Sequence, residues 1–205
     1  DPATLSSHDL VSYKARDGMT IEGYLSIPKN AGEGPYPLVL HPHGGPGARD
    51  VDGFDYWTSF FNSRGYAVFR PNFRGSTGYG YEFSQSQMQS WGLEMQDDLT
   101  DAVDWLVEEG VADAERVCIV GASYGGYAAA MGVAKTPDKF KCAVSFAGVM
   151  NLRRLLMDAR QYVNYRLVKN QIGEDRSDLK VRSPYYSAEK IKVPLLLIHG
   201  EKDLV

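Results

Sequence analysis

Several features that mark other classes of protein are missing from this sequence. No apolar run approaches the roughly 18 residues of a membrane-spanning helix, and no secretory signal opens the chain. The 22 Lys and Arg against 26 Asp and Glu give a net charge of −4. This balance is too mild to indicate a nucleic-acid partner or a polybasic membrane contact. We expect a globular protein that is compatible with an oligomer. Its compartment stays open: a cytoplasmic location is favoured, and a periplasmic or secreted one is the alternative.

Cysteine is scarce, since only Cys118 and Cys142 occur, each inside an apolar run. Such positions favour buried free thiols, although adjacent strands could bring the two together. Neither lies beside a motif that lowers a thiol pKa, so no cysteine nucleophile is expected. The phosphate-binding patterns G-x-x-x-x-G-K-[ST] and G-x-G-x-x-G are absent as well. His41 and His43 form an H-x-H pattern without further clustered ligands, so we expect neither a metal nor a cofactor.

The sequence does contain the pattern of one α/β domain over residues 1–205, with 43% hydrophobic residues. Two short strands joined by the Asp17-Gly18 turn predict a hairpin at the N-terminal end. After it, apolar strands alternate with amphipathic helices, which predicts a mostly parallel sheet with helices on both faces. The predicted strands are 8–14, 20–27, 38–43, 66–70 (stopped by Pro71), 116–120, 141–147 and 193–199, and the predicted helices are 54–62, 93–109, 124–134 and 152–168.

The sharpest motif is the G-x-S-x-G pattern of residues 121–125. Alone it is weak evidence in a glycine-rich chain, but its context strengthens it. A buried strand (117–120) precedes it and a small-residue helix (126–131) follows, as required for a strained turn that lifts a serine hydroxyl above a sheet. Ser123 is therefore a candidate nucleophile. The minor alternative is a glycine-rich turn with an incidental serine.

A serine nucleophile needs N–H donors for the oxyanion, and each is worth roughly 3–4 kcal/mol. The backbone N–H of Tyr124 qualifies, because it follows the serine at a helix N-terminus. A second donor is expected from the loop at residues 43–47, whose glycines permit close approach to a substrate. The alternative for this loop is an ordinary tight turn.

An acid is expected after a late strand, because in this fold the acid follows the serine and precedes the histidine. Asp203 lies just beyond the strand at 193–199 and would orient the imidazole; a solvated loop acid is the alternative. The chain has four histidines, all before Asp203, and none is placed to accept the Ser123 proton. They are His8, His41, His43 and His199, of which the last is expected to anchor the acid loop.

Four segments combine into one signature. They are His-Gly-Gly-Pro (43–46), Asn-Phe-Arg-Gly-Ser-Thr-Gly-Tyr-Gly (72–80), Gly-Ala-Ser-Tyr-Gly-Gly-Tyr (121–127) and Leu-Ile-His-Gly-Glu-Lys-Asp (197–203). Together they resemble the prolyl oligopeptidase family of serine peptidases, and most closely its acylaminoacyl-peptidase and dipeptidyl-peptidase-like branch. Residues 15–25 resemble the start of that family's hydrolase domain, so the resemblance covers nearly the whole chain.

The resemblance implies an α/β-hydrolase fold and assigns roles to particular residues. Ser123 would be the nucleophile and Asp203 the acid of the triad. Gly45 and Tyr124 would donate to the oxyanion. The pocket for the residue before the scissile bond would be lined by Val149 and Leu152, and residues 74–80 would be a structural neighbour of the site.

Two departures from the family pattern shape the expected function. The family's N-terminal β-propeller is not in this chain, nor is the segment after the acid with a helix, a strand, the catalytic histidine and a final helix. We expect a serine exopeptidase acting on short peptides through an acyl-enzyme, with this chain a truncated and inactive piece. The propeller and the missing C-terminal segment would be its partners. A carboxylesterase of the same fold and a non-catalytic scaffold are the alternatives.

Overall fold

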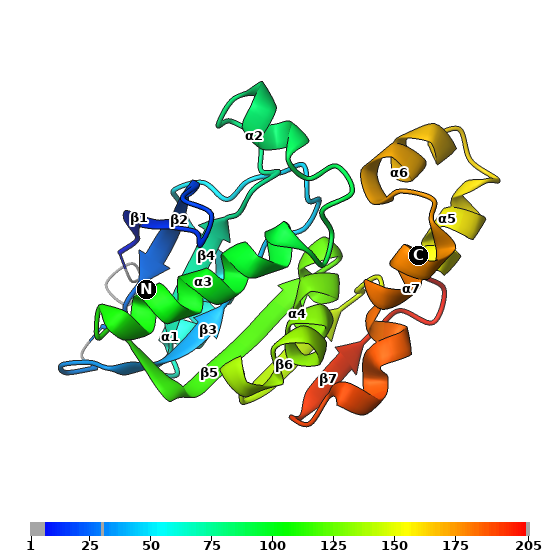
Figure 1. Cartoon of the computed structure of the whole chain (residues 1–205). Coiled ribbons are helices and arrows are strands. Elements are labelled where there is room, and N and C mark those ends of the chain that lie inside the picture. The colour runs from blue at the N-terminus through cyan, green and yellow to red at the C-terminus, as the bar shows by residue number, and fades with distance from the viewer. Residues whose placement is uncertain (1–6, 30, 204–205) are drawn as a thin grey trace.

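The computed structural model describes residues 7–29 and 31–203, and within them a seven-stranded sheet forms the centre (Figure 1). In sheet order the strands are β1 (Asp9–Lys14), β2 (Thr20–Ser26), β4 (Ala67–Asn72), β3 (Tyr36–Leu40), β5 (Ala112–Ala122), β6 (Cys142–Phe146) and β7 (Leu195–Ile198). The β1–β2 and β2–β4 pairs are antiparallel, and the pairs from β4 to β7 are parallel. The predicted α/β class and the N-terminal hairpin are confirmed.

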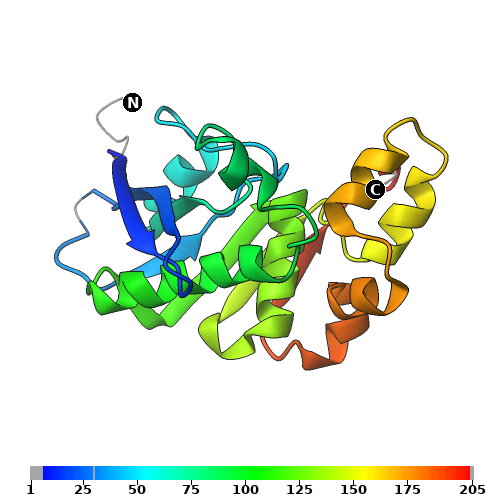
Figure 2. The same cartoon turned by 45° about the horizontal axis from the view of Figure 1, so that its top comes forward.

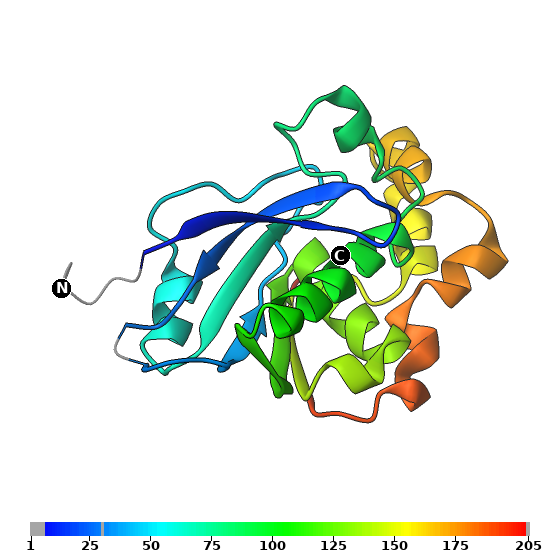
Figure 3. The same cartoon turned by 60° about the vertical axis from the view of Figure 1, so that its left-hand side comes forward.

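Helices cover both faces of the sheet (Figures 2 and 3). Because successive strand residues point to opposite faces, Ile119 of β5 joins the larger core cluster and Val120 joins a smaller one. The larger cluster includes buried residues of α3 (Glu94–Glu108) and α4 (Tyr124–Lys135). On the other face, α1 (Tyr56–Asn62) adds a partly buried side chain to the smaller cluster. A short helix, α2 (Tyr81–Gln85), was not predicted.

The region after β6 forms more and shorter helices than the sequence predicted. In place of one helix over 152–168 the chain forms α5 (Leu152–Ala159) and α6 (Tyr165–Ile172). The intervening residues 160–164 are all exposed, so a continuous helix would have had no core to pack against there. Then α7 (Arg176–Val181) and a 3₁₀ helix (Pro184–Lys190) lead to β7. These segments lie at the end of the molecule away from the hairpin (Figures 1 and 2).

The strand β4 continues through Pro71, where the sequence predicted a stop. The register of β3 with β4 ends at the pair of Leu40 and Phe69. At Pro71 the strand therefore has only β2 as a neighbour, with Gly23 opposite. The missing N–H of proline costs little at such an edge-like position.

The two cysteines form a disulfide, so the expectation of free thiols was wrong. Cys118 of β5 and Cys142 of β6 lie opposite each other in the parallel register, with Cα atoms 4.7 Å apart. Their side chains share one face of the sheet because paired residues point the same way. Within the described part of the chain, no helix is both long enough and apolar enough to cross a membrane.

Candidate active site

Ser123 sits at the sharp junction between β5 and α4. Its φ of 56° lies in the left-handed region that non-glycine residues rarely adopt, and the residue is exposed. Its N–H donates to the carbonyl of Phe146 (2.9 Å), and its own carbonyl accepts from Tyr127 (3.0 Å). Such strain, held by backbone hydrogen bonds, is typical of a functional position.

Glycines make this turn possible. A Cβ at Gly121 would lie 2.4 Å from the backbone of Gly125, so any larger residue would push β5 and α4 apart. A Cβ at Gly125 would lie 2.2 Å from the carbonyl oxygen of Pro42. The turn therefore packs backbone to backbone against the segment that follows β3.

The loop at residues 43–47 approaches Ser123 from that side. A Cβ added at Gly44 would lie 3.3 Å from the carbonyl oxygen of Ala122 and 3.6 Å from the Cβ of Ser123. Gly45 follows with a φ of 120°, which favours glycine. Tyr124 is the first residue of α4, where a backbone N–H has no partner within the helix. The structure thus brings Ser123, Tyr124 and the loop of Gly45 together.

The segment 72–80 is anchored underneath by a buried ion pair. Asp98 of α3 is fully buried and accepts from the backbone N–H of Arg74 (2.9 Å) and from its guanidinium (2.7 and 2.9 Å). Burial raises the pKa of Asp98 to about 6, against the opposing effect of Arg74. A second carboxylate, that of Asp17, lies 2.8 Å from the same guanidinium. Arg74 thereby ties the β1–β2 turn and α3 to this segment.

Asp203 lies in the turn after β7, and the Nε2 atom of His199 lies 3.2 Å from its carboxylate. This contact agrees with the expectation that His199 anchors the acid loop. Ser123 follows β5 and Asp203 follows β7, with β6 between them. Two strand spacings separate these positions by about 10 Å, a gap that an imidazole and its two hydrogen bonds would span.

No hydrogen bond within residues 7–29 and 31–203 joins Ser123 to a histidine. His41 bonds the carbonyl of Val120 through Nδ1 (2.6 Å), and His43 bonds Ser76 and Gly44. Over the same residues, no three His, Cys, Asp or Glu side chains are grouped as a metal site.

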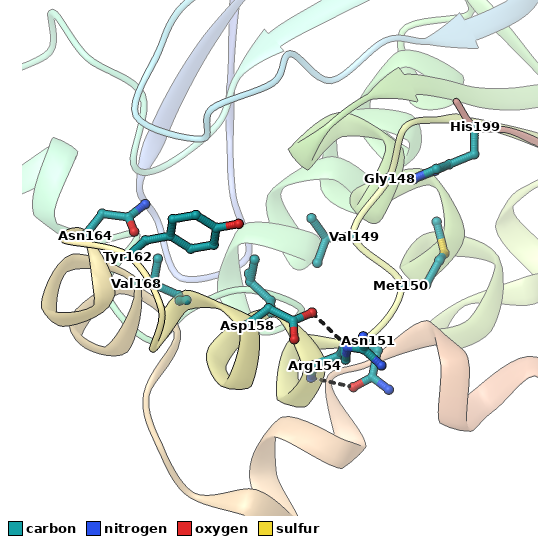
Figure 4. Close-up of a pocket in the computed structure, with 12 residues that line it drawn as sticks. Gly148, Val149, Met150, Asn151, Arg154, Asp158, Tyr162, Asn164, Val168 and His199 are labelled. Carbon is teal, nitrogen blue, oxygen red and sulfur yellow. Dashed lines mark hydrogen bonds and ion pairs between the residues drawn. The ribbon is translucent and has the colours of Figure 1, made fainter. Parts of the chain in front are cut away.

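A pocket of about 540 Å³ lies beside the turn that carries Ser123 (Figure 4). It begins at Gly148, where an added Cβ would lie 2.7 Å from the backbone of Gly126 in the first turn of α4. Figure 4 shows His199 beside Gly148 at one end and Tyr162 and Asn164 at the other.

The walls of this pocket are mostly apolar. Val149, one of the predicted pocket residues, lines it. Leu152, the other, is fully buried, and its backbone N–H donates to the Ser183 hydroxyl oxygen (2.9 Å). Sequence reasoning missed Leu155 and Ala159, which line the pocket from α5. Their i, i+4 spacing on a predicted helix is the signal that could have found them. The rim carries the exposed pair of Arg154 and Asp158 (2.7 Å).

Comparison with known proteins identifies clear relatives. The model of the prolyl oligopeptidase family matches residues 53–205. Dipeptidyl aminopeptidase BIII of Pseudoxanthomonas mexicana is 41% identical over 207 residues, covering 94% of this chain and 30% of that protein. The acylamino-acid-releasing enzyme of Arabidopsis thaliana is 31% identical, covering 82% and 23%. The structure of a Mycobacterium tuberculosis puromycin-hydrolyzing peptidase matches with a TM-score of 0.88 and 30% identity, covering 98% and 31%. The chain thus spans under a third of these relatives' length.

Proposed function

The chain belongs to the prolyl oligopeptidase family, and we propose from this that it carries the nucleophile and oxyanion groups of a serine peptidase that cleaves short peptides. The observation that carries the proposal is the strained, exposed conformation of Ser123 between β5 and α4. Natural sequences retain such strain where the surroundings enforce it for function.

In the proposed reaction, the Ser123 oxygen attacks the scissile carbonyl carbon and its proton passes to a histidine. The N–H groups of Gly45 and Tyr124 donate to the oxyanion that forms. The histidine then protonates the leaving amine as the C–N bond breaks, which leaves an ester on Ser123 that water hydrolyses. We assign the base to a histidine from outside the described residues, held between Ser123 and Asp203.

The pocket beside Ser123 supports an apolar residue before the scissile bond. Val149, Leu155, Ala159 and Val168 contribute apolar surface to it. We propose that Leu152 supports this wall from below, since it is fully buried at the start of α5. The relatives are named as a dipeptidyl aminopeptidase, an acylamino-acid-releasing enzyme and a puromycin-hydrolyzing peptidase, and these names support a short substrate.

Labelling with a fluorophosphonate probe tests the nucleophile in the full-length protein. We expect one labelled peptide, containing Ser123, and no label in Ser123→Ala. The control is Ser63→Ala, which removes an exposed hydroxyl at the end of α1 and should leave labelling unchanged. Label on another serine, or label that persists in Ser123→Ala, would contradict the proposal.

A second candidate, a non-catalytic scaffold, is favoured by the lack of a histidine bonded to Ser123 within the described residues. Loss of the base from a triad costs several orders of magnitude in kcat. We therefore expect negligible turnover of peptide anilides by the 205-residue chain alone. Turnover of simple esters without peptide anilides by the full-length protein would instead indicate a carboxylesterase.

A further inference from the structure

We propose that the junction of α5, α6 and α7 binds a tetrahedral oxyanion, either a phosphate ion or a phosphoryl group, through Arg153, Arg160 and Arg176. The site lies behind the wall of the pocket beside Ser123 and takes no part in the reaction proposed above. It can therefore be tested whether or not that reaction is correct.

The segment that forms this end of the molecule differs in charge from the rest of the chain. Residues 150–192 contain ten Lys and Arg against five Asp and Glu, although the whole chain has a net charge of −4. Charges of one sign around a cleft raise the local concentration of ions of the opposite sign. The charge surplus therefore indicates that a ligand of this segment would be an anion.

A small second pocket gives the place where an anion fits. It has a volume of about 70 Å³ and lies where α5, α6 and α7 meet. Its floor is apolar, since Leu156 of α5 and Leu179 of α7 are 6% and 1% exposed. The volume exceeds the space of one water molecule and is far below that of a drug-sized ligand. It therefore suits a group of a few atoms.

Helical spacing separates this pocket from the one beside Ser123. Arg153, Met157 and Arg160 follow one another at intervals of four and three residues, which places them on one face of α5. Leu155 and Ala159 are also four residues apart, and they line the larger pocket from the other face. One short helix thus carries a side for each pocket.

The arginines of the small pocket have no acid partner. Arg154, their neighbour on α5, pairs with Asp158 (2.7 Å). By contrast, in the part of the chain that the structure describes, no ion pair or side-chain hydrogen bond occupies the guanidinium of Arg153, Arg160 or Arg176. The N–H groups of these three side chains are therefore available to a ligand.

Other charges near the pocket do not cancel this surplus. Glu174 also lines the pocket, but its carboxylate lies 2.6 Å from the Nζ atom of Lys169. The guanidinium carbon of Arg153 lies 5.9 Å from the centre of the Tyr186 ring, and the Nζ atom of Lys180 lies 5.5 Å from the same ring. The aromatic ring thus holds a further cation close to Arg153.

The number of arginines favours phosphate over a carboxylate. The two oxygens of a carboxylate lie in one plane, and the planar fork of a single arginine can bind both. A phosphate group presents three or more acceptor oxygens in different directions. Guanidinium groups that come from two helices, Arg153 and Arg160 from α5 and Arg176 from α7, match that arrangement.

An anion bound here would link α5 to α7. Residues 160–164 after α5 are all exposed, so this end of the helix is not packed into the core. An oxyanion shared by Arg160 and Arg176 supplies a contact between the two helices. Because a ligand that binds only the folded form stabilises it, hydrogen exchange in α5 and α7 should slow about tenfold when the phosphate concentration is about ten times its Kd.

Calorimetric titration of the full-length protein with inorganic phosphate tests the site, at an ionic strength held constant with sodium chloride. We expect saturable binding that weakens about tenfold in Arg160→Gln and in Arg176→Gln, as for loss of one charge-assisted hydrogen bond. Both side chains are exposed, so the variants should fold like the wild type. The matched control is Arg166→Gln, which removes the same charge from α6 outside the pocket and should leave the affinity unchanged.

A parallel titration with phenyl phosphate distinguishes the two sources of the oxyanion. Tighter binding of the monoester than of inorganic phosphate would assign the site to the phosphoryl group of a larger molecule. Tighter binding of inorganic phosphate would assign it to the free ion. Either result supports the site if binding again weakens in Arg160→Gln and Arg176→Gln.

Three results would overturn the proposal. The first is the absence of saturable binding of either compound. The second is an equal loss of affinity in Arg166→Gln and Arg176→Gln, because general attraction to a basic surface would then explain the binding. The third is phosphate that binds but leaves hydrogen exchange in α5 and α7 unchanged, which would place the bound ion elsewhere in the protein.

Discussion

The two sides of the site are built differently. On the oxyanion side (residues 41–47, 72–76 and 121–127), backbone packs on backbone, so that an added Cβ at Gly125 would lie 2.2 Å from the Pro42 carbonyl oxygen. On the pocket side (residues 148–168 and 195–203), residues 160–164 between α5 and α6 are all exposed. The first side packs closely on its own neighbours, and this stretch of the second side does not.

This difference matches what each side must do. Stabilising an oxyanion requires hydrogen-bond donors that are fixed before the reaction, because the free energy spent on reorienting them would offset the stabilisation they give. A substrate pocket tolerates adjustment, since apolar contacts are not directional. The ion pairs of the two sides differ in burial. On the oxyanion side, the side chains of Arg74 and Asp98 are 7% and 0% exposed. On the pocket side, those of Arg154 and Asp158 are 72% and 34% exposed.

The largest effect should come from Arg74→Met. The substitution leaves the Asp98 carboxylate buried without its charge partner, which typically costs about 3–5 kcal/mol. The matched control, Arg154→Met, breaks an exposed pair and should cost about 0–1 kcal/mol. Urea denaturation of both variants measures the difference. Equal losses would remove the contrast between the two sides.

The disulfide joins the two sides, because β5 leads to Ser123 and β6 leads to Gly148. Replacing Cys118 and Cys142 together by alanine should cost about 3.5 kcal/mol, the chain-entropy value for a separation of 24 residues. Hydrogen exchange should then accelerate more in β6 and β7 than in β5, since the other neighbour of β5 is the interior strand β3, whereas that of β6 is β7, the last strand of the sheet in the described residues. Uniform acceleration across the sheet would contradict this. A reductant added to the wild type should lower the unfolding midpoint in the same way.

The oxyanion side was also the more predictable from sequence. The turn around Ser123 depends on local spacing, glycines and flanking elements, all visible in a short window. The contact between His43 and Ser76 joins residues 33 apart, and nothing local encodes it. The disulfide likewise depends on the register of β5 with β6, which a one-residue slip would undo.

The pocket side was less predictable because its elements are short. The pattern over 152–168 is helical, but whether one helix or two forms depends on where the core ends. Leu152 and Leu155 are both apolar and three residues apart, so only the packing decides that Leu152 is buried and Leu155 lines the pocket. Asp203 could be chosen as the candidate acid because the topology of this fold places the acid after a late strand.

Filling the pocket should change specificity without changing the nucleophile. Ala159→Leu adds three carbons to the lining, and we expect kcat/KM for substrates with a bulky apolar residue before the scissile bond to fall about 10–200-fold. Fluorophosphonate labelling of Ser123 by a small probe should be unaffected, because the oxyanion side is built independently. Ala188→Leu adds the same carbons at an exposed position outside the lining and serves as control. An equal fall in labelling would show that the two sides are coupled.

The smallest effect concerns Asp17, at the outer edge of the Arg74 network. Its hydrogen bond from Arg74 lowers the pKa of its carboxyl, so its contribution to stability is present above its ordinary pKa and is lost as the pH falls through the lowered value. The side chain is 45% exposed, and solvent screening should keep the contribution below about 1 kcal/mol. Asp17→Asn should therefore lower the urea midpoint slightly at pH 5.5 and converge with the wild type as the pH falls below the lowered pKa of Asp17.

A difference between Asp17→Asn and the wild type that persists below the lowered pKa would show that the side chain contributes through packing. Convergence would indicate that the buried pair of Arg74 and Asp98, rather than Asp17, stabilises the oxyanion side. Convergence would mean that the exposed carboxylate of Asp17 adds only a small, pH-dependent amount to the free energy of unfolding, although it binds the same guanidinium as Asp98. Ion pairing by itself would not distinguish the two sides of the site; burial of the pair would.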